Sequence, residues 1–449
     1  MRLFGTDGVR GVANADLTPE LTFAVGRAGA AVIARNAPAD RAIVVGRDTR
    51  MSGPMLEAAI VAGITSAGRD VIILGVVPTP AVACITRDIQ AAAGVMISAS
   101  HNPVEDNGIK FFGPDGFKLS NAVEDEIERA LDAIDLPRPT HQGVGRVLAQ
   151  PGLIDRYVAG LLEAGSDLQG LTIVVDAAFG AAFRIGPEVL EQLGAEVVGL
   201  HAQDDGTRIN VECGATDLRA LRAKVEEVAK QRPQAHVVGV AFDGDADRAL
   251  FVDEQAQPVS GDHAMLILAR ERKADGALAG DTVVGTVMSN IGLEHALGAE
   301  GITLLRAAVG DRYVLEMMRA GAYSLGGEQS GHIIDLERNT TGDGIMTAVA
   351  LFSIVARRKT TLRELGSALR IYPQILLNVR TTNKEVLYED ADVRAAIARA
   401  EEALAHRGRV LVRPSGTEPL IRVMMEGDDQ GEIDRLAHEL ANIIHKAAR

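Results

Sequence analysis

The sequence predicts an α/β protein: three related α/β domains with mostly parallel mixed sheets, followed by a smaller α+β domain at the C-terminus. Three segments of the chain repeat one order of elements, namely an apolar strand, a glycine-containing turn, an amphipathic helix and a second apolar strand. Such alternation indicates βαβ units. The 449 residues suit about three or four domains. A content of 47% hydrophobic and 24% charged residues is typical of a globular protein with packed cores.

The strands of these segments are runs of valine, isoleucine and leucine without alternation, as expected of strands that helices cover on both faces. We expect the strand, helix and strand of the first segment at residues 42–46, 54–65 and 71–74. Those of the second lie at 172–176, 183–193 and 196–200, and those of the third at 282–287, 291–297 and 302–306. The three segments share their order of elements rather than their sequences.

Composition also indicates where domains begin and end. Residues 136–152 carry three prolines and three glycines without periodicity, which is typical of a linker, and residues 253–262 form a polar loop near a second boundary. A short helical pattern over residues 357–373 ends before Pro373. We then expect a strand at 375–379, a long helix near 385–406, two short strands around 413–419 and a helix from residue 432. The expected domains are residues 1–150, 151–255, 256–368 and 369–449.

Charge and cysteine content limit the possible functions. A net charge of −15 repels nucleic acid and anionic membranes, so neither is an expected partner, and an anionic ligand would need a local cluster of cationic groups. Cys84 and Cys213 cannot form a disulfide framework or a zinc knuckle, and suit small buried residues in a reducing compartment. Because the N-terminus lacks an apolar core of signal-peptide length and no apolar stretch could span a bilayer, we expect a cytoplasmic protein.

Three aspartates alternate directly after a hydrophobic strand at residues 237–242. If the backbone stays roughly extended, Asp243, Asp245 and Asp247 point the same way. Three carboxylates at the carboxyl end of a strand suit Mg²⁺, which prefers oxygen ligands. An EF-hand is excluded, because its sixth position requires glycine and is Arg248, and a strand follows. A solvated acidic turn is the remaining alternative.

A second strand, at residues 94–97, ends in the sequence SASHNP, whose turn is fixed by Pro103. A serine hydroxyl there could act as a nucleophile or a phosphoryl carrier. A phosphoserine would add oxygens that complete the coordination of Mg²⁺. The local pattern fits an Asx or ST turn equally well. A serine hydrolase is disfavoured, because the chain contains no G-x-S-x-G sequence.

A turn near the C-terminus has the composition of a phosphate site. Ser415, Gly416 and Thr417 supply hydroxyls and backbone N–H groups, and Arg413 and Arg422 flank them with guanidinium groups. This set suits a phosphate dianion. An ordinary hairpin turn fits the same residues.

Two further glycine-rich stretches are less specific. In GGEQSGH, Glu328 and Ser330 can bond to adjacent sugar hydroxyls and His332 titrates near neutrality, although this stretch by itself favours a loop without a ligand. The N-terminal FGTDGVRG offers Arg10 as an anion-binding candidate. The chain contains no Walker A, complete G-x-G-x-x-G or H-E-x-x-H sequence, so NTPase, nicotinamide dehydrogenase and zinc protease functions have no support.

With these stretches together, the chain resembles the α-D-phosphohexomutase superfamily over its whole length. Six motifs stand in the family's order: FGTDGVRG, ISASHNPVEDNGIKFF, FDGDADR, VGDRYV, GGEQSGH and RPSGTEPLIRV. The GEQSGH form, with TTGDGI at residues 340–345, points to the bacterial glucosamine-phosphate branch.

The resemblance implies four domains around a central cleft, each giving one loop, and a homodimer. It implies interconversion of glucosamine 6-phosphate and glucosamine 1-phosphate through a phosphoserine and a 1,6-bisphosphate, in the supply of UDP-N-acetylglucosamine and cell-wall precursors. One Mg²⁺ per chain would be the cofactor, and glucosamine or glucose 1,6-bisphosphate the activator or intermediate. By matched position, Ser100 carries the phosphoryl group, Lys110 and His332 are candidates for acid–base work, and Arg248 lies beside the transferring phosphate.

The resemblance also implies the remaining site residues. The implied metal ligands and substrate contacts are Ser100, Asp243, Asp245 and Asp247 for the metal, and Arg10, His101, Glu328, Ser330, Arg413, Ser415, Gly416, Thr417 and Arg422 for the substrate. Ala246 stands where the family more often has glycine, so a positive φ there would be strained, and Ala215 stands where serine is usual. The alternatives are the same chemistry on glucose or mannose phosphates, a Mg²⁺-dependent phosphatase, and a non-enzymatic sugar-phosphate sensor.

Overall fold

The structure is a computed structural model that describes residues 3–5, 7–35, 37–38, 40–131, 133, 136, 138–150, 152–415 and 419–448. Contacts divide the chain into two units. The first comprises Met1–Met288 with Ile302–Ala368, and the second Ser289–Gly301 with Leu369–Arg449.

The first sheet has six strands in the order β1-β5-β4-β2-β3-β6. Strand β2 pairs in parallel with β3 and β4, and β3 with β6, whereas β5 runs antiparallel to β4 and β1. The elements of this part are β1 (Val9–Val12), α1 (Pro19–Ala34), β2 (Ile43–Arg47), α2 (Gly53–Ser66), β3 (Val71–Val76), α3 (Thr79–Asp88), β4 (Ala93–Ile97), β5 (Asp106–Phe112), α4 (Asn121–Leu131), the 3₁₀ helix η1 (His141–Gly143) and β6 (Val147–Leu148).

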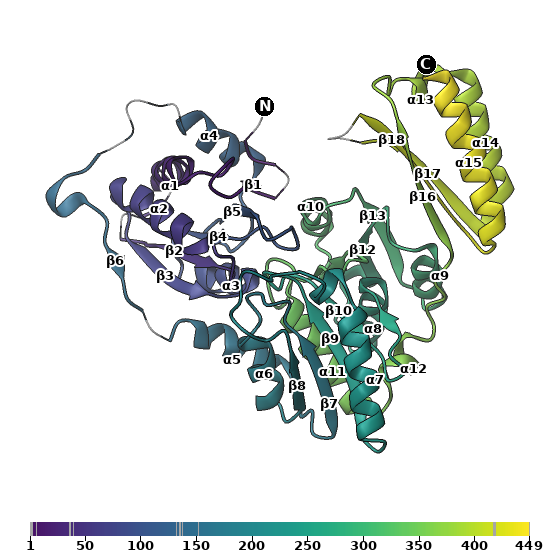
Figure 1. Cartoon of the computed structure of the whole chain (residues 1–449), viewed down its shortest axis with the longest axis horizontal. Coiled ribbons are helices and arrows are strands. Elements are labelled where there is room, and N and C mark those ends of the chain that lie inside the picture. The colour runs from purple at the N-terminus through teal and green to yellow at the C-terminus, as the bar shows by residue number, and fades with distance from the viewer. Residues whose placement is uncertain are drawn as a thin grey trace. The chain divides into compact units, whose positions relative to one another are not determined.

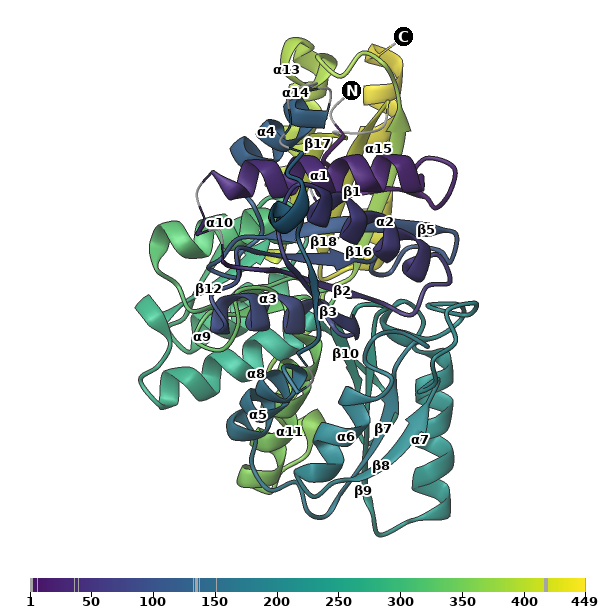
Figure 2. The same ribbon diagram turned by 90° about the vertical axis from the view of Figure 1, so that its left-hand side faces the viewer.

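Helices cover both faces of the first sheet, as the unbroken apolar strands predict. Ile43 and Val45 of β2 pack against α1 and α2, whereas Val44 packs with Ile85 of α3 on the other face. Successive side chains of a strand point to opposite faces, so a strand between two helix layers is apolar throughout. Figures 1 and 2 show α1 and α2 side by side on one face and α3 on the other.

The second sheet has five strands in the order β11-β10-β9-β7-β8. Strands β7, β8 and β9 are parallel, and β10 runs antiparallel to β9 and β11. Val174 of β7 packs against Leu221 and Val225 of α7. The elements are α5 (Ile154–Ala164), β7 (Leu171–Asp176), α6 (Ile185–Gln192), β8 (Glu196–Leu200), η2 (Gly214–Thr216), α7 (Arg219–Gln231), β9 (His236–Phe242), β10 (Ala249–Val252) and β11 (Pro258–Val259).

The third sheet has four strands in the order β13-β12-β14-β15. Strand β12 is parallel to β13 and β14, and β15 is antiparallel to β14. The elements are α8 (Gly261–Ala274), η3 (Ala279–Asp281), β12 (Thr282–Thr286), β13 (Thr303–Ala307), α10 (Asp311–Gly321), β14 (Leu325–Gly327), β15 (Ile333–Asp335), α11 (Gly344–Arg358) and α12 (Leu362–Gly366). Three mixed, mostly parallel sheets with helices confirm the predicted α/β class.

The second unit contains a three-stranded antiparallel sheet in the order β16-β18-β17. Ile421, Val423 and Met425 of β18 form a core with residues of α14 and α15. The elements are α9 (Ile291–Ala299), β16 (Gln374–Arg380), α13 (Val386–Glu389), α14 (Ala391–Leu404), η4 (Ala405–Arg407), β17 (Gly408–Pro414), β18 (Leu420–Gly427) and α15 (Gln430–Ala447). This confirms the smaller α+β domain.

Some local expectations differ from the structure. Residues 136–152, predicted as a linker, contain η1 and β6, and residues 253–262, predicted as a loop, contain β11. The long helix expected near residues 385–406 is two helices, because the Asp390 carboxylate caps α14 by accepting the N–H groups of Asp392 and Val393 at 2.9 Å. The two short strands expected around residues 413–419 form a hairpin of seven and eight residues.

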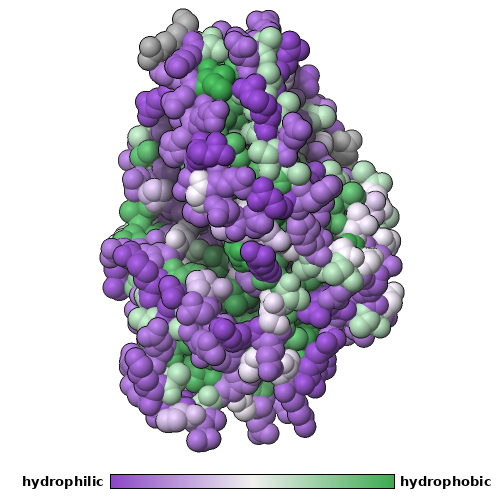
Figure 3. Space-filling view, turned by 90° about the vertical axis from the view of Figure 1, so that its right-hand side faces the viewer, coloured by the Kyte–Doolittle hydropathy of each residue, from purple (hydrophilic) through white to green (hydrophobic). Residues whose placement is uncertain are grey.

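Apolar side chains gather in these cores rather than at the surface. On the face shown in Figure 3, hydrophilic side chains predominate and hydrophobic ones occur in small groups. Within the described parts of the chain, no helix combines the length and the apolar character needed to cross a membrane.

Candidate active site

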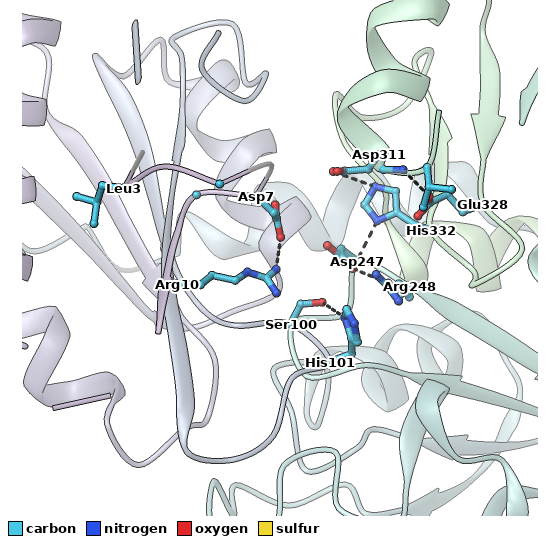
Figure 4. Close-up of a pocket in the computed structure, with 14 residues that line it drawn as sticks. Leu3, Asp7, Arg10, Ser100, His101, Asp247, Arg248, Asp311, Glu328 and His332 are labelled. Atoms are coloured by element: carbon cyan, nitrogen blue, oxygen red, sulfur yellow. Dashed lines mark hydrogen bonds and ion pairs between the residues drawn. The ribbon is translucent and has the colours of Figure 1, made fainter. Parts of the chain in front are cut away.

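A cavity of about 400 Å³ lies in the first unit, where loops that follow β4, β9 and β14 meet. This position agrees with the rule that ligands bind at the carboxyl ends of strands in open α/β sheets. Figure 4 shows the side chains that converge there. The charged and polar residues of its lining are Asp7, Arg10, Ser100, His101, Asp247, Arg248, Asp311, Glu328 and His332.

Ser100 lies in the loop between β4 and β5 and is 2% exposed. Its Oγ donates a hydrogen bond to Asp243 Oδ2 at 2.7 Å and lies 3.3 Å from His101 Nδ1. Its backbone is left-handed, with φ at 53°. Such a conformation in a residue other than glycine costs of order 1–3 kcal/mol and persists only where the surroundings enforce it. The structure therefore holds this hydroxyl in one position against the aspartate loop.

Arg50 holds the loop of Ser100. This guanidinium is fully buried and donates to the carbonyl oxygens of Ser100 at 2.9 Å and Asn102 at 2.8 Å. It also donates to the carbonyls of Pro103 and Asp106, and its Nε pairs with Asp48 Oδ2 at 3.0 Å. Five donors in a rigid fork suit such a set of acceptors.

Asp48 and Asn210 complete this support. Asp48 Oδ2 accepts the Ser98 hydroxyl at 2.7 Å, and Ser98 Oγ in turn accepts the Ser100 N–H at 2.9 Å. Burial raises the pKa of Asp48, and the Arg50 guanidinium counteracts part of that shift. From the segment between β8 and η2, Asn210 Nδ2 donates to the Ser100 carbonyl at 2.9 Å. None of Arg50, Asp48 and Asn210 was among the residues predicted from sequence.

The loop of Asp243, Asp245 and Asp247 is a turn between the antiparallel strands β9 and β10, rather than the extended segment that the sequence predicts. The carboxylates nevertheless converge, because the turn bends back at Ala246, whose φ is 57°. The strain expected at this alanine is thus present. Ala215, the other departure from the family pattern, lies in η2.

The three aspartates fit a divalent cation. One carboxylate oxygen from each lies within 4.8 Å of the other two, and all three residues are buried. Among the described residues, none donates a hydrogen bond to Asp245 Oδ1 or Asp247 Oδ1. Burial raises the pKa of Asp243, and the neighbouring Asp247 and Asp245 raise it further. A bound cation would relieve this repulsion and supply the missing partners.

Lys110 lies beneath the aspartates and is 2% exposed. Its Nζ lies 3.0 Å from Asp245 Oδ2, 3.2 Å from Asp7 Oδ2 and 3.8 Å from Asp247 Oδ2. Burial lowers the pKa of Lys110, but the Asp245 and Asp7 carboxylates outweigh it and the net pKa is raised. The side chain is therefore a fixed ammonium group.

His332 lies between two carboxylates, as Figure 4 shows. Its Nδ1 is 3.5 Å from Asp247 Oδ1 and its Nε2 is 3.7 Å from Asp311 Oδ2. Burial lowers the pKa of His332, but Asp247 and Asp311 outweigh it and the net pKa is raised. The Gly342 N–H donates to Nε2 at 3.2 Å, which favours the neutral ring instead. These opposed influences suit a group that gains and loses a proton at Nε2.

Gly342, in the TTGDGI stretch, must be small for this arrangement. A Cβ at residue 342 would lie 2.4 Å from His332 Nε2, so a side chain there would displace the ring. The TTGDGI stretch, which pointed to the glucosamine branch, thus packs against the His332 ring through Gly342.

Lys118 connects the N-terminal loop to α10. Its Nζ lies 2.5 Å from Asp7 Oδ1 and forms an ion pair with Asp311. Sequence reasoning assigned no role to these three residues. Asp7 and Asp311 lie inside the family motifs FGTDGVRG and VGDRYV, so the sequence could have indicated them as site residues. Lys118 lies outside these motifs, and only its closeness to Lys110 in the sequence could have indicated it.

The remaining predicted residues of the first unit lie at or near the cavity. Arg10 forms an ion pair with Asp7 and donates to Asn102 Oδ1 at 3.1 Å. Glu328 Oε1 accepts the Gly310 N–H at 3.1 Å, and Ser330 occupies the same turn as Glu328 without lining the cavity.

Two basic groups flank Ser100 at the cavity. The Arg248 N–H donates to Asp243 Oδ1 at 3.2 Å, and its side chain lines the cavity. Burial, followed by the charge of Arg248, lowers the pKa of His101 to about 4, so this imidazole is neutral near pH 7.

In the second unit, Arg413 and Arg422 stand opposite each other on β17 and β18. Burial and the charge of Arg422 lower the pKa of Arg413, which an anion between the two guanidinium groups would reverse. Ser415 is buried, and its N–H donates to the Leu420 carbonyl at 2.9 Å. Gly416 and Thr417, also predicted for this site, lie outside the described residues.

Four parts of the chain match the domains of one protein family. Phosphoglucomutase/phosphomannomutase alpha/beta/alpha domains I, II and III match residues 1–138, 155–257 and 260–372, and the C-terminal domain matches residues 376–443. The chain belongs to the phosphoglucomutase/phosphomannomutase family.

Within this family, the relatives of the chain include proteins named phosphoglucosamine mutase. That of Symbiobacterium thermophilum is 54% identical over 447 residues, which cover 99% of this chain and 98% of the relative. That of Moorella thermoacetica is 54% identical over 445 residues, which cover 98% of this chain and 99% of the relative.

Solved structures share the fold of the phosphoglucomutase/phosphomannomutase family. A family protein from Burkholderia thailandensis has a TM-score of 0.82 at 23% identity, covering 99% of this chain and 97% of that chain. The N-acetylphosphoglucosamine mutase of Aspergillus fumigatus, solved with GlcNAc-6P and magnesium, has a TM-score of 0.68 at 18% identity, covering 100% of this chain and 96% of that chain.

Proposed function

We propose that this chain interconverts glucosamine 6-phosphate and glucosamine 1-phosphate, with Ser100 as the carrier of the phosphoryl group. The relatives named phosphoglucosamine mutase, 54% identical over nearly the whole chain, support the substrate. The observation that carries the role of Ser100 is the 2.7 Å hydrogen bond from its Oγ to Asp243 Oδ2. This contact puts a nucleophilic oxygen of the cavity at the edge of the carboxylate cluster.

The reaction consists of two phosphoryl transfers. Phosphorylated Ser100 gives its phosphoryl group to the O1 hydroxyl of the 6-phosphate: the P–Oγ bond breaks, a P–O1 bond forms, and the hydroxyl proton passes to a base. The 1,6-bisphosphate then turns over: its P–O6 bond breaks, a P–Oγ bond forms, and O6 takes up the proton that the base had accepted, which releases the 1-phosphate. A carrier is required because O1 and O6 lie at opposite ends of the sugar.

The cationic groups and the base have separate tasks. Asp243, Asp245 and Asp247 would hold Mg²⁺, which when bound offsets the charge on the phosphoryl oxygens. The ammonium of Lys110 adds positive charge beside the aspartates. Its raised pKa keeps it protonated, which opposes a role as the base. His332 is the better candidate for the base: its pKa is also raised, but from an ordinary value near neutrality, and its ring lines the cavity.

The substrate contacts fall into groups that bind the sugar hydroxyls, the transferring phosphoryl group and the other phosphate group. Glu328 and Ser330 would bind the sugar hydroxyls, and Arg10, His101 and Arg248 would lie near the transferring phosphoryl group. In the second unit, Arg413, Ser415, Gly416, Thr417 and Arg422 would bind a phosphate group. The paired guanidinium groups on β17 and β18 support this assignment.

Rates with three hexose 6-phosphates, measured side by side, test the substrate. We expect kcat/KM for glucosamine 6-phosphate to exceed that for glucose and mannose 6-phosphate by at least about tenfold, because a site that binds the C2 amino group binds a C2 hydroxyl in its place less well. Equal or higher rates with glucose or mannose phosphate would assign the other branch of the family. Release of free phosphate would indicate a phosphatase, and binding without turnover a sensor.

Replacing Asp245 with asparagine tests the metal site. We expect the Mg²⁺ concentration that gives half-maximal activity to rise at least about tenfold, because a carboxylate ligand is replaced by a neutral amide and Lys110 loses its nearest partner. Metal titration of activity provides the measurement. Asp217→Asn is the matched control, since this aspartate pairs with exposed Arg219. An unchanged metal requirement in Asp245→Asn would remove Asp245 from the site.

The homodimer and the cytoplasmic location expected from the sequence remain predictions. Light scattering on the purified protein and fractionation of the source cells test them separately. A monomer in solution would correct the expected assembly without affecting the proposed reaction.

A further inference from the structure

A second cluster of metal-binding side chains lies beside the second sheet, apart from the cavity. Asp176 ends β7, His201 directly follows β8, and Cys213 directly precedes η2. One carboxylate oxygen, one imidazole nitrogen and the sulfur of these residues lie within 4.8 Å of one another. Asp176 and Cys213 are fully buried, and the His201 side chain is 22% exposed. The sheet topology brings three separate segments to this point.

The donor atoms differ in kind from those of the three aspartates. A set of sulfur, nitrogen and oxygen suits Zn²⁺, whereas an all-oxygen set suits Mg²⁺. With zinc bond lengths of about 2.0–2.3 Å, tetrahedral donors lie about 3.3–3.7 Å apart. His201 Nδ1 and Asp176 Oδ1 are 3.0 Å apart, and the Cys213 sulfur lies within 4.8 Å of one carboxylate oxygen of Asp176 and one imidazole nitrogen of His201. Side-chain shifts of about 1 Å therefore suffice to form the site.

Asp176 keeps acceptor capacity for a metal. Its Oδ1 accepts the Ala178 N–H at 3.0 Å and faces His201 Nδ1, and its Oδ2 accepts the Gly214 N–H at 3.0 Å. A carboxylate offers about four acceptor positions, so an ion can replace the imidazole contact while both backbone hydrogen bonds remain. The partly exposed imidazole leaves one side open to solvent, where a water molecule can complete the coordination.

We propose that Asp176, His201 and Cys213 bind one Zn²⁺ ion, with water as the fourth ligand. Binding releases the Cys213 thiol proton to solvent, while His201 binds through Nδ1 as the neutral ring with its proton on Nε2, and no oxidation or reduction occurs. Burial and the Asp176 carboxylate raise the pKa of the Cys213 thiol to about 12, so the ion itself provides the charge that stabilises the thiolate.

The ion would have a structural role. It fastens the segment of residues 201–213 to the end of β7, and this segment carries Asn210. The Asn210 N–H donates to the Ala178 carbonyl at 3.0 Å, and its side chain donates to the Ser100 carbonyl at 2.9 Å. The site would thereby support the loop of Ser100 from the second sheet. It does not depend on the proposed reaction, because its donors line no part of the cavity.

Cobalt substitution tests the site directly. The full-length protein is stripped with a chelator, supplied with excess Mg²⁺ to occupy the three aspartates, and titrated with Co²⁺. We expect a thiolate-to-cobalt charge-transfer band in the near ultraviolet that saturates at one equivalent and disappears when Zn²⁺ is added. Oxygen ligands alone give no such band. Absence of the band in the wild-type protein would overturn the proposal.

The chain supplies its own control, because Cys84 is its other cysteine. Cys213→Ala should lose the band, whereas Cys84→Ala, which also removes a buried thiol, should keep it. The opposite pattern would overturn the assignment. If Cys213→Ala does not fold, His201→Gln decides the matter: a Co²⁺ affinity at least tenfold weaker supports the site, and an unchanged affinity contradicts it.

Discussion

Ser100→Ala is expected to lower kcat of the mutase reaction by at least about 10⁴-fold while the protein stays folded. Without Oγ no phosphoryl group can be carried, and residual catalysis in enzymes that lose a nucleophile is far below the wild-type rate. The substitution removes the hydrogen bonds of Oγ with Asp243 and His101, so the free energy of unfolding should change by about 1–2 kcal/mol. Coupled assays of 1-phosphate formation and urea denaturation measure the two quantities.

A control serine in the same part of the chain separates the two effects. Ser66 ends α2, and its hydroxyl donates to the Gly63 carbonyl. Ser66→Ala should therefore keep nearly the wild-type kcat. A Ser100→Ala variant with near-normal turnover would remove Ser100 from the reaction, whatever the behaviour of the control.

Arg50→Met is expected to be the most damaging substitution outside the cavity. It leaves Asp48 as a buried carboxylate without its guanidinium partner and removes the donor shared by the carbonyls around Ser100. Breaking a buried ion pair by removing one partner costs about 3–5 kcal/mol of stability. Because displacement of a reacting group by about 1 Å can cost 10²-fold in rate, we expect kcat to fall by at least about that factor.

The control for Arg50→Met is Arg146→Met, which breaks another arginine–aspartate pair in the same domain. Arg146 pairs with Asp70, but its side chain is 75% exposed, so water replaces the lost contact and stability should change far less. Arg50→Lys keeps the positive charge but lacks the several N–H donors of the guanidinium group. Its kcat and its free energy of unfolding should therefore lie between those of Arg50→Met and wild type. Equal unfolding free energies for Arg50→Met and Arg146→Met would show that the buried guanidinium does not hold the loop.

Much of the fold was predictable because its strands are buried on both faces. The unbroken apolar runs at residues 42–46, 172–176 and 282–287 correspond to β2, β7 and β12. Each of these strands has a neighbouring strand on both sides in its sheet. The break between α13 and α14 was missed, because the residues on both sides of it have the pattern of one amphipathic helix. Only the side chain of Asp390, which caps the N-terminus of α14, separates the two helices. The short strands β6 and β11 have two residues each, too few for any periodic pattern.

The candidate site was predictable where one short segment carries the chemistry, as in Asp243, Asp245 and Asp247. Their convergence was expected from an extended backbone and arises instead from a turn at Ala246, whose positive φ an alanine, unlike the glycine usual in the family, does not indicate. Arg50 was missed because the carbonyls that it holds lie 50 to 56 residues away along the chain. The partners of Lys118 lie even farther away. Lys118 pairs with Asp7 and Asp311, 111 and 193 residues distant.

Intact mass of the wild-type protein before and after incubation with glucose 1,6-bisphosphate tests the central claim most directly. We predict that the mass rises by one phosphoryl group, that peptide mapping places this group on Ser100, and that addition of glucosamine 6-phosphate removes it. Ser100→Ala should gain nothing under the same conditions. A wild-type protein that turns over substrate while its mass stays unchanged, or that carries the group on another residue, would contradict the account.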